Sequence, residues 1–360
     1  MNAASSTRAH APLAGTSPAP DRYIRQRMFA PIGTDGQRRL LDAHVALVGC
    51  GALGSAVADS LARAGVGTLT IIDRDFVELH NLQRQSLFQE SDVRDHLPKA
   101  EAAAARLRTV NGDVRIAAVV ADVNAANILE LTADADVLVD GTDNFETRYL
   151  INDAAFKTGR PWVYGGVIAS YGMSMTIRPG ITSCLRCVFP DPPDAGSAPT
   201  CDTAGVLGPA VHMVAAIQSA EVIKLAVGAF DAINTDLLAI DLWSLSFDRV
   251  PLPGPRSDCP MCGPDPRFDF LERVQSSRET VLCGHDAVQI VVRPEIALDL
   301  PLLAERLRPA GDVLLTRFLL RFTDAVSGRQ MTVFPNGRAI VKGVSEPTDA
   351  RIFYDRFIGR

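Results

Sequence analysis

Hydrophobic and polar positions alternate in two different rhythms along the first half of the chain. Short apolar runs of the kind found in buried strands occupy residues 45–48, 69–73, 114–120, 136–140 and 162–167. Between these runs, apolar positions recur at helical spacing before Gly65, from Pro98, at 125–131 and at 145–157. This alternation predicts an α/β fold, with a mixed, mainly parallel sheet that carries helices on both faces.

The pattern changes after residue 171. Strands with polar alternation are followed by a Pro-rich segment, a long apolar helix at 206–227 and two strands at 237–242 and 245–250. We expect these strands to extend the sheet edge in antiparallel fashion, and the short strands and helices near the end of the chain to form a small α+β module. The expected organisation is a disordered tail, a main domain, a linker and a C-terminal domain of unknown role, at residues 1–20, 21–263, 264–282 and 283–360.

Composition narrows the class of protein. The chain has 360 residues, of which 47% are hydrophobic and 22% are charged, as is typical of a soluble globular protein. The net charge of −6 and the lack of a basic block argue against a nucleic-acid partner. Polar residues interrupt the apolar helix at 206–227, and the first twenty residues lack a signal-peptide core, so we expect a cytoplasmic protein without a membrane span.

A glycine-rich turn follows the first predicted strand. Gly49, Gly51 and Gly54 form a G-x-G-x-x-G pattern in "GCGALG", and the next apolar run ends at Asp73. In a Rossmann-like unit such glycines permit a tight turn, bring the backbone close to a phosphate and let the next helix pack closely. Asp73 is placed to accept hydrogen bonds from ribose hydroxyls. The pattern favours nucleotide binding over a purely structural turn, but it does not choose between NAD and ATP.

Three charged residues near the ends of predicted elements suggest a phosphate site. Lys99 stands in the first turn of a helix, where a cation opposes the helix dipole, so it either serves a ligand or is a solvated surface lysine. Together with Arg84 it could clamp a triphosphate. Asp143 follows the carboxyl end of a strand, where it either binds Mg²⁺ or caps the helix that begins near Phe145.

Two C-x-x-C pairs are the strongest chemical signal in the chain. They are "CLRC" and "CPMC", with cysteines at Cys184, Cys187, Cys259 and Cys262. Four thiolates form a complete tetrahedral set for a structural Zn²⁺, with redox-active pairs as the alternative. The 71 residues between the pairs exceed a compact zinc ribbon, so the fold must bring the pairs together.

The remaining cysteines carry weaker signals. Cys201 lies in a segment rich in Pro, Gly and Ser just before a helix, where a thiol can be exposed and reactive. It is either a nucleophile or an incidental loop cysteine. Cys50 and Cys283 are expected to be small packing residues.

These features occur in an order that resembles the MoeB/ThiF (HesA) family of sulfur-carrier adenylyltransferases, relatives of ubiquitin-activating enzymes. The matching motifs span residues 22–263 and are "RYIRQ", "GTDGQRRL", "GCGALG", "NLQRQ", "PKAE", "GTDN" and both cysteine pairs. The resemblance implies that MgATP adenylates the C-terminal Gly-Gly carboxylate of a small ubiquitin-like carrier protein of the MoaD or ThiS type and that pyrophosphate is released. Thiocarboxylate pathways such as those to molybdopterin or thiamine would use the product.

The resemblance also implies a role for each site residue. The phosphate turn would comprise Gly49, Gly51, Ala52 and Gly54. Asp73 would hold the ribose, and Asp143 would bind Mg²⁺. The residues that would meet the phosphates are Asn81, Arg84 and Lys99. Arg25, from the R-Y-x-R motif, would reach into the site of a partner subunit, which implies a homodimer.

Two features of the chain leave part of the implied function open, namely Cys201 and the C-terminal module. Cys201 aligns with a cysteine that links covalently to the carrier in only some members of the family, so conjugation through a Cys201 thioester is an alternative activity. The C-terminal module is too short for a rhodanese domain, which implies a separate sulfur donor such as a cysteine desulfurase or rhodanese. An NAD-dependent oxidoreductase is less favoured, because it leaves Arg84, Lys99, Asp143 and the cysteine pairs without a shared purpose.

Overall fold

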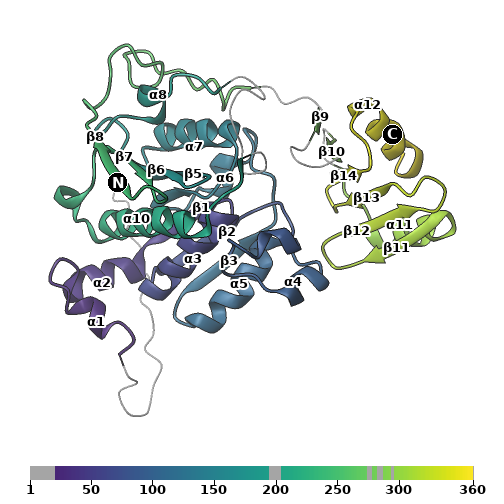
Figure 1. Cartoon of the computed structure of the whole chain (residues 1–360), viewed down its shortest axis with the longest axis horizontal. Coiled ribbons are helices and arrows are strands. Elements are labelled where there is room, and N and C mark those ends of the chain that lie inside the picture. The colour runs from purple at the N-terminus through teal and green to yellow at the C-terminus, as the bar shows by residue number, and fades with distance from the viewer. Residues whose placement is uncertain (1–20, 194–203, 274–277, 282–286, 293–295, 360) are drawn as a thin grey trace, which may run out of the picture.

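Two sheets organise the chain. The computed structural model describes residues 21–193, 204–273, 278–281, 287–292 and 296–359. The larger body runs from purple to green in Figure 1, and the smaller C-terminal body is yellow. Each body has its own sheet and its own hydrophobic core.

The larger sheet has eight strands in the order β3-β2-β1-β4-β5-β6-β7-β8. The strands are β1 (His44–Val48), β2 (Thr68–Ile72), β3 (Arg115–Val119), β4 (Val137–Asp140), β5 (Trp162–Ile168), β6 (Tyr171–Ile177), β7 (Leu237–Asp241) and β8 (Ser246–Val250). β1 to β5 pair in parallel, whereas β6, β7 and β8 pair antiparallel, which confirms the predicted mixed sheet. Because β1 lies between β2 and β4, the strand order reverses there and opens a ligand crevice at the carboxyl ends.

Helices cover both faces of this sheet, as predicted. The side chains of β1 alternate between two cores, with Val45 and Leu47 in one and Ala46 and Val48 in the other. The first core contains residues of α3, α5 and α10, and the second contains residues of α7. The helices of this body are α1 (Ile24–Arg27), α2 (Gly33–Asp42), α3 (Ala52–Ala64), η1 (Leu79–Asn81), α4 (Glu90–Arg94), α5 (Lys99–Val110), α6 (Ile128–Leu131), α7 (Phe145–Thr158), α8 (Leu185–Val188), α10 (Gly208–Val227) and η2 (Phe230–Ala232).

α6 is shorter than the sequence pattern suggests. A helix was expected over residues 125–131, but it begins only at Ile128. The side chain of Asn127 accepts a hydrogen bond from the backbone of Asn124 at 2.8 Å, and the side chain of Asn124 accepts one from Ala126 at 3.0 Å. These side-chain bonds hold residues 124–127 in a turn.

α10 lies against the sheet in Figure 1 and packs on α3, β5 and β6. Its length and composition alone would suit a membrane span, with a mean hydropathy of 1.4, but 56% of that window is buried inside this body. Its polar residues find partners there, since Gln218 donates to the Asp140 carbonyl at 2.8 Å and Glu221 accepts from Thr176 at 2.9 Å. These contacts are those of a core helix.

The C-terminal body is a six-stranded antiparallel sheet with two packed helices, which confirms the expected α+β module. Its strand order is β11-β12-β13-β14-β10-β9. Its elements are β9 (Arg278–Val281), β10 (Ala287–Val291), α11 (Leu300–Leu307), η3 (Arg308–Ala310), β11 (Gly311–Leu315), β12 (Leu320–Asp324), β13 (Gln330–Val333), β14 (Ala339–Lys342) and α12 (Pro347–Phe357). β9 pairs with β10, so part of the stretch expected as a linker, 264–282, joins this sheet.

Candidate functional site

At the turn after β1, the backbone packs closely against the backbone of the loop that follows β4. Gly49 has φ +90°, and a Cβ at this position would lie 2.6 Å from the Gly141 carbonyl oxygen. A Cβ at Gly54 would lie 2.1 Å from the Gly49 carbonyl oxygen. Both positions therefore need glycine for the turn to pack against the loop that follows β4.

Gly51 needs a different explanation. Among the described residues, the nearest atom to a Cβ at this position would be Nε2 of Gln85, at 3.8 Å, which is ordinary contact distance. The packing of these residues thus leaves room for a side chain at this position. Gly51 is also the N-cap of α3 and provides no side-chain cap, and Ala52 is the first residue of that helix. The first N–H groups of α3 are thereby left for an anion that approaches the bare backbone.

Asp73 lies beside this turn, just after β2. One of its carboxylate oxygens accepts a hydrogen bond from the backbone N–H of Cys50 at 2.6 Å, and the other accepts from Asp75 at 2.7 Å. The residue is 9% exposed, and burial raises the pKa of its carboxyl group. These bonds hold Asp73 against the glycine turn. Cys50 is fully buried, which confirms that it is a packing residue.

Lys99 is not a solvated surface lysine. It is the first residue of α5, 8% exposed, and its ammonium lies 3.2 Å from the carboxylate of Asp75. Its backbone N–H also donates to the Asp75 carbonyl at 2.8 Å. Burial disfavours the charged form of Lys99, but the negative charges of Asp75 and other nearby acids outweigh burial and raise the pKa of Lys99. The buried cation faces the carboxyl end of β2, where a phosphate would approach.

Asp75 was not predicted as a site residue. Burial raises the pKa of its carboxyl group, but Lys99 and Arg74 outweigh burial and lower it to about 2. Arg74 in turn donates to Asp122, after β3, at 2.8 Å. The sequence signal that could have identified it is the second acid of the "DRD" triplet, residues 73–75, which follows directly after the buried strand β2.

Asp143 does not cap α7. The cap is Asn144, whose side chain accepts a hydrogen bond from the Thr147 N–H at 2.9 Å. Asp143 is exposed. Burial opposes the charges of Arg74, Lys99 and Arg148, but a closer acid raises the pKa of each, and the charge of Asp143 adds a smaller contribution in the same direction. The carboxylate therefore lies at the carboxyl end of β4 without a hydrogen-bond or ion-pair partner among the described residues, within electrostatic range of the cations around the glycine turn.

Asn81 and Arg84 stand on and just after the short helix η1. The side-chain Oδ1 of Asn81 accepts from the backbone N–H of Glu78 at 3.1 Å and closes a capping box. The partly exposed Arg84 donates to the His80 carbonyl at 3.0 Å. Between this segment and the glycine turn, Oε1 of buried Gln85 has no hydrogen-bond partner within the described residues. A buried polar atom without a partner in this position is consistent with a ligand site.

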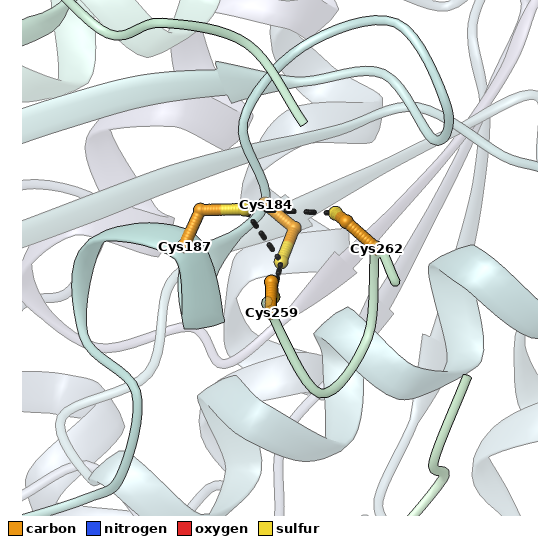
Figure 2. Close-up of side chains that lie close together, drawn as sticks. All are labelled: Cys184, Cys187, Cys259 and Cys262. Atoms are coloured by element: carbon orange, nitrogen blue, oxygen red, sulfur yellow. Dashed lines mark hydrogen bonds between the residues drawn. The ribbon is translucent and has the colours of Figure 1, made fainter. Parts of the chain in front are cut away.

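The four cysteines of the two C-x-x-C pairs form one cluster, shown in Figure 2. Sγ of Cys184 lies 3.7 Å from that of Cys187 and 3.6 Å from that of Cys259, and the sulfurs of Cys187 and Cys262 are 3.6 Å apart. Four sulfurs bound to one Zn²⁺ at about 2.3 Å would stand about 3.8 Å apart. The donor set and its spacing therefore fit a closed tetrahedral zinc site better than two separate redox pairs.

The predictions for Cys201 and Cys283 fall on residues outside the described part of the chain, and Arg25 stands apart from the glycine turn. Arg25 is exposed on α1, where its guanidinium contacts the sulfur of Met28 at 3.9 Å. The neighbouring Gln26 donates to the Ala64 carbonyl at 2.9 Å, which places α1 at the far end of α3 from the glycine turn. A helix of 13 residues spans about 20 Å, so Arg25 lies well away from the phosphate turn of its own chain.

Comparison with known proteins agrees with this geometry. A model of the ThiF family matches residues 23–261. The chain is 43% identical to the sulfur carrier protein ThiS adenylyltransferase of Bacillus subtilis, across 94% of this chain and 99% of that protein. It is 42% identical to the SAMP-activating enzyme E1 of Haloferax volcanii, across 68% and 88%. The crystal structure of Escherichia coli MccB with ATP matches at a TM-score of 0.58 and 23% identity, over 69% of this chain and 75% of that one, which supports the fold alone.

Proposed function

This chain belongs to the ThiF family, and from that premise we propose that it is an adenylyltransferase for a ubiquitin-like sulfur carrier protein. It would join AMP from ATP to the C-terminal Gly-Gly carboxylate of the carrier and release pyrophosphate. One observation supports this most directly: the buried Lys99 and the exposed carboxylate of Asp143 stand around a glycine turn at which, within the described residues, Gly51 has room for a ligand. An NAD enzyme would give these charges no common task.

The reaction needs stabilisation of charge rather than proton transfer. A carboxylate oxygen of the carrier attacks the α-phosphorus of ATP, and the bond from that phosphorus to the oxygen bridging to the β-phosphorus breaks. The electron pair of that bond leaves with pyrophosphate. Because the attacking group is already ionised, the site requires cations aimed at the phosphates rather than a general base. Lys99 and Arg84 would supply those cations.

The nucleotide would lie along the carboxyl edge of β1 and β2. The backbone from Gly49 to Gly54, Ala52 included, would hold the phosphates, and Asp73 would accept from the ribose hydroxyls. Asn81 and Gln85 would face the phosphates from η1. Asp143 would hold Mg²⁺, which offsets phosphate charge and keeps several waters as ligands. The role of Asp143 is supported by its exposure and by the loss of its alternative as a helix cap.

Zinc would be structural at the four-cysteine cluster. Cys184, Cys187 and Cys259 are buried in the second core of the main body, and four thiolates leave no open coordination position. The metal would tie the segment after β6 to the loop near residue 260, and no step of the reaction would pass through it.

The proposal also covers the oligomeric state of the enzyme, its sulfur donor and its location. The distance of Arg25 from its own glycine turn supports a homodimer in which Arg25 completes the site of the partner subunit. A separate protein would donate sulfur, and we place the enzyme in the cytoplasm. A thioester at Cys201 stays a prediction, because that residue lies outside the described part of the chain.

Exchange of labelled pyrophosphate into ATP tests the activity. We expect the wild-type protein to catalyse this exchange with a carrier that ends in Gly-Gly, with ThiS as the first probe. Asp143→Asn should abolish exchange, whereas Asp42→Asn, at an exposed carboxylate at the end of α2, should leave it unchanged. Absence of exchange in the wild type with every Gly-Gly carrier tried would overturn the proposal, and full exchange in Asp143→Asn would overturn the role of Asp143.

A mixing experiment tests the dimer. Arg25→Ala and Asp143→Asn should each be inactive as homodimers. If Arg25 acts on the partner's site, each mixed dimer has one intact site, and random mixing should restore about a quarter of wild-type exchange. No recovery on mixing, with mixed dimers demonstrated by mass spectrometry, would show that Arg25 acts within its own subunit.

A further inference from the structure

The C-terminal domain docks on the loops that follow β2 and β3. Next to Asp75, the ring of Phe76 lies 5.6 Å from the ring of Phe334, centroid to centroid. Lys342 forms an ion pair with Glu78 at 3.2 Å. The loop after β2 carries Asp73 and leads into η1, so the domain sits against the segment that the proposed nucleotide site uses.

Arg338 is a buried contact of the domain with the main body. It is 5% exposed, and its guanidinium donates to the Arg74 carbonyl at 3.0 Å and to the Gln289 side chain at 3.2 Å. The same guanidinium lies 3.7 Å from the centre of the Phe334 ring. Burial and the positive charge of Arg74 lower the pKa of Arg338 to about 10. The burial of a guanidinium at the edge of another domain costs free energy, which indicates that Arg338 has a function at that position.

A cavity of about 220 Å³ lies beside Arg338, between the two bodies. It has room for a group much larger than one water. Its lining includes Val120, Asp122 and Asn124 from the main body, and Val291, Asn336 and Arg338 from the C-terminal domain. The lining is more polar than apolar: its amide, carboxylate and guanidinium groups would hydrogen-bond the edge of a heterocyclic base, and its valines would pack against the ring.

The cavity lies where the base of a bound nucleotide would project. In a doubly wound sheet the phosphates lie at the turn after β1 and the ribose at the carboxylate after β2, so the base continues toward the next strand outward. That strand is β3, which ends at Val119, and the cavity wall begins at Val120.

We propose that the C-terminal domain forms the outer wall of the nucleotide site and that Val291, Asn336 and Arg338 enclose the adenine base of ATP. This inference rests on the proposed adenylyltransferase function. It assigns the domain a task in nucleotide selection: the main body would hold the phosphates and ribose, and the C-terminal domain would hold the base.

Val291 offers a direct test. Along β10, Val288 and Ile290 lie in the core of the C-terminal domain, so the alternate positions Gln289 and Val291 face the main body. Val291→Trp should fill the cavity and weaken ATP binding about tenfold or more, measured by calorimetry on the full chain. Binding of inorganic tripolyphosphate, which has no base, should stay unchanged. Val326→Trp, at a position 87% exposed in a turn of the same domain, is the matched control.

Hydrogen exchange on the wild-type protein gives a test without a mutation. Saturating ATP should slow amide exchange at residues 288–292 and 336–340, whereas tripolyphosphate should not. Equal weakening of ATP and tripolyphosphate in Val291→Trp, or ATP binding equal to that of Val326→Trp, would overturn the inference, as would unchanged exchange at both segments. A wild-type protein that binds neither ligand would instead overturn the proposed function.

Discussion

Removal of the Lys99 charge tests how much the ion pair between Lys99 and Asp75 contributes to stability and activity. Lys99→Met keeps the length and packing of the side chain but removes its charge. The carboxylate of Asp75 would then lose its nearest cation, at 3.2 Å. The carboxylate of Asp73 would lose the positive charge of Lys99, which opposes the rise in its pKa caused by burial. We expect the variant to fold with lower stability and to have no pyrophosphate exchange activity, because both the carboxylates and the ATP phosphates depend on this cation.

The size of the effect follows from the burial of the two partners. Removal of one partner from a fully buried pair costs about 3–5 kcal/mol, and exposed pairs contribute at most about 1 kcal/mol. The Lys99 side chain is 10% exposed, but that of Asp75 is 47% exposed, so solvent screens the pair in part. The lowering of the Asp75 pKa from 3.8 to about 2 is a shift from all its cations together, and screening reduces its contribution to stability. We therefore expect a coupling of about 1–2 kcal/mol.

A double-mutant cycle measures this coupling. Lys99→Met, Asp75→Asn and the double variant are unfolded in urea beside the wild type, and the interaction free energy is taken from the four values. At pH 7 a coupling below about 0.3 kcal/mol would contradict the reasoning, because independent sites add within that margin. The coupling should be present above pH 4 and decline as the pH falls toward 2, since protonation of Asp75 in the folded state removes it.

Two further predictions concern the second core. Purified protein should contain about one zinc per chain, and Cys262→Ser should lower both zinc content and urea stability; a folded wild-type protein without metal would contradict the tetrathiolate site. Asp153 is fully buried, and burial raises its pKa to about 6. Its folded form therefore keeps a proton that the unfolded chain loses near pH 4, so stability falls as the pH rises between these values. Asp153→Asn should gain about 2 kcal/mol relative to the wild type between pH 4 and pH 7, measured by urea unfolding, and an equal difference at both pH values would contradict it.

The parts of the fold that were predictable from the sequence are those with local causes. A run such as Val45–Val48 must be buried on both faces, and a glycine pattern followed by an apolar helix has few other conformations. The cysteine pairs were predictable as one metal site because each pair is short and incomplete alone. α6 was predicted too long because Asn124 and Asn127 use their side chains to hold a turn, and that competition is not visible in apolar periodicity.

The role of Asp75 depends on its contact with the buried Lys99 rather than on a motif. In the sequence it is one of two acids beside Arg74, and nothing in the triplet distinguishes the acid that pairs with Lys99 from the acid that faces the turn. The structure separates them, because Asp73 is held by two backbone N–H groups and Asp75 contacts the ammonium. Alternation along a strand would put residues 73 and 75 on the same face, so their separation comes from the turn after β2, where the Asp73 side chain accepts from the Asp75 N–H.

The contact between Arg338 and Arg74 joins residues 264 positions apart, and Arg338 lies beyond the span that the ThiF family model matches. The Bacillus subtilis relative aligns with 340 residues of this chain, which leaves too few unmatched residues to exclude the C-terminal domain. The Haloferax volcanii relative aligns with 243 residues. If the C-terminal domain encloses the base, then relatives that match only the adenylation unit must close that side of the nucleotide by other means. The Val291→Trp experiment measures the contribution that the C-terminal domain adds to ATP binding in this chain.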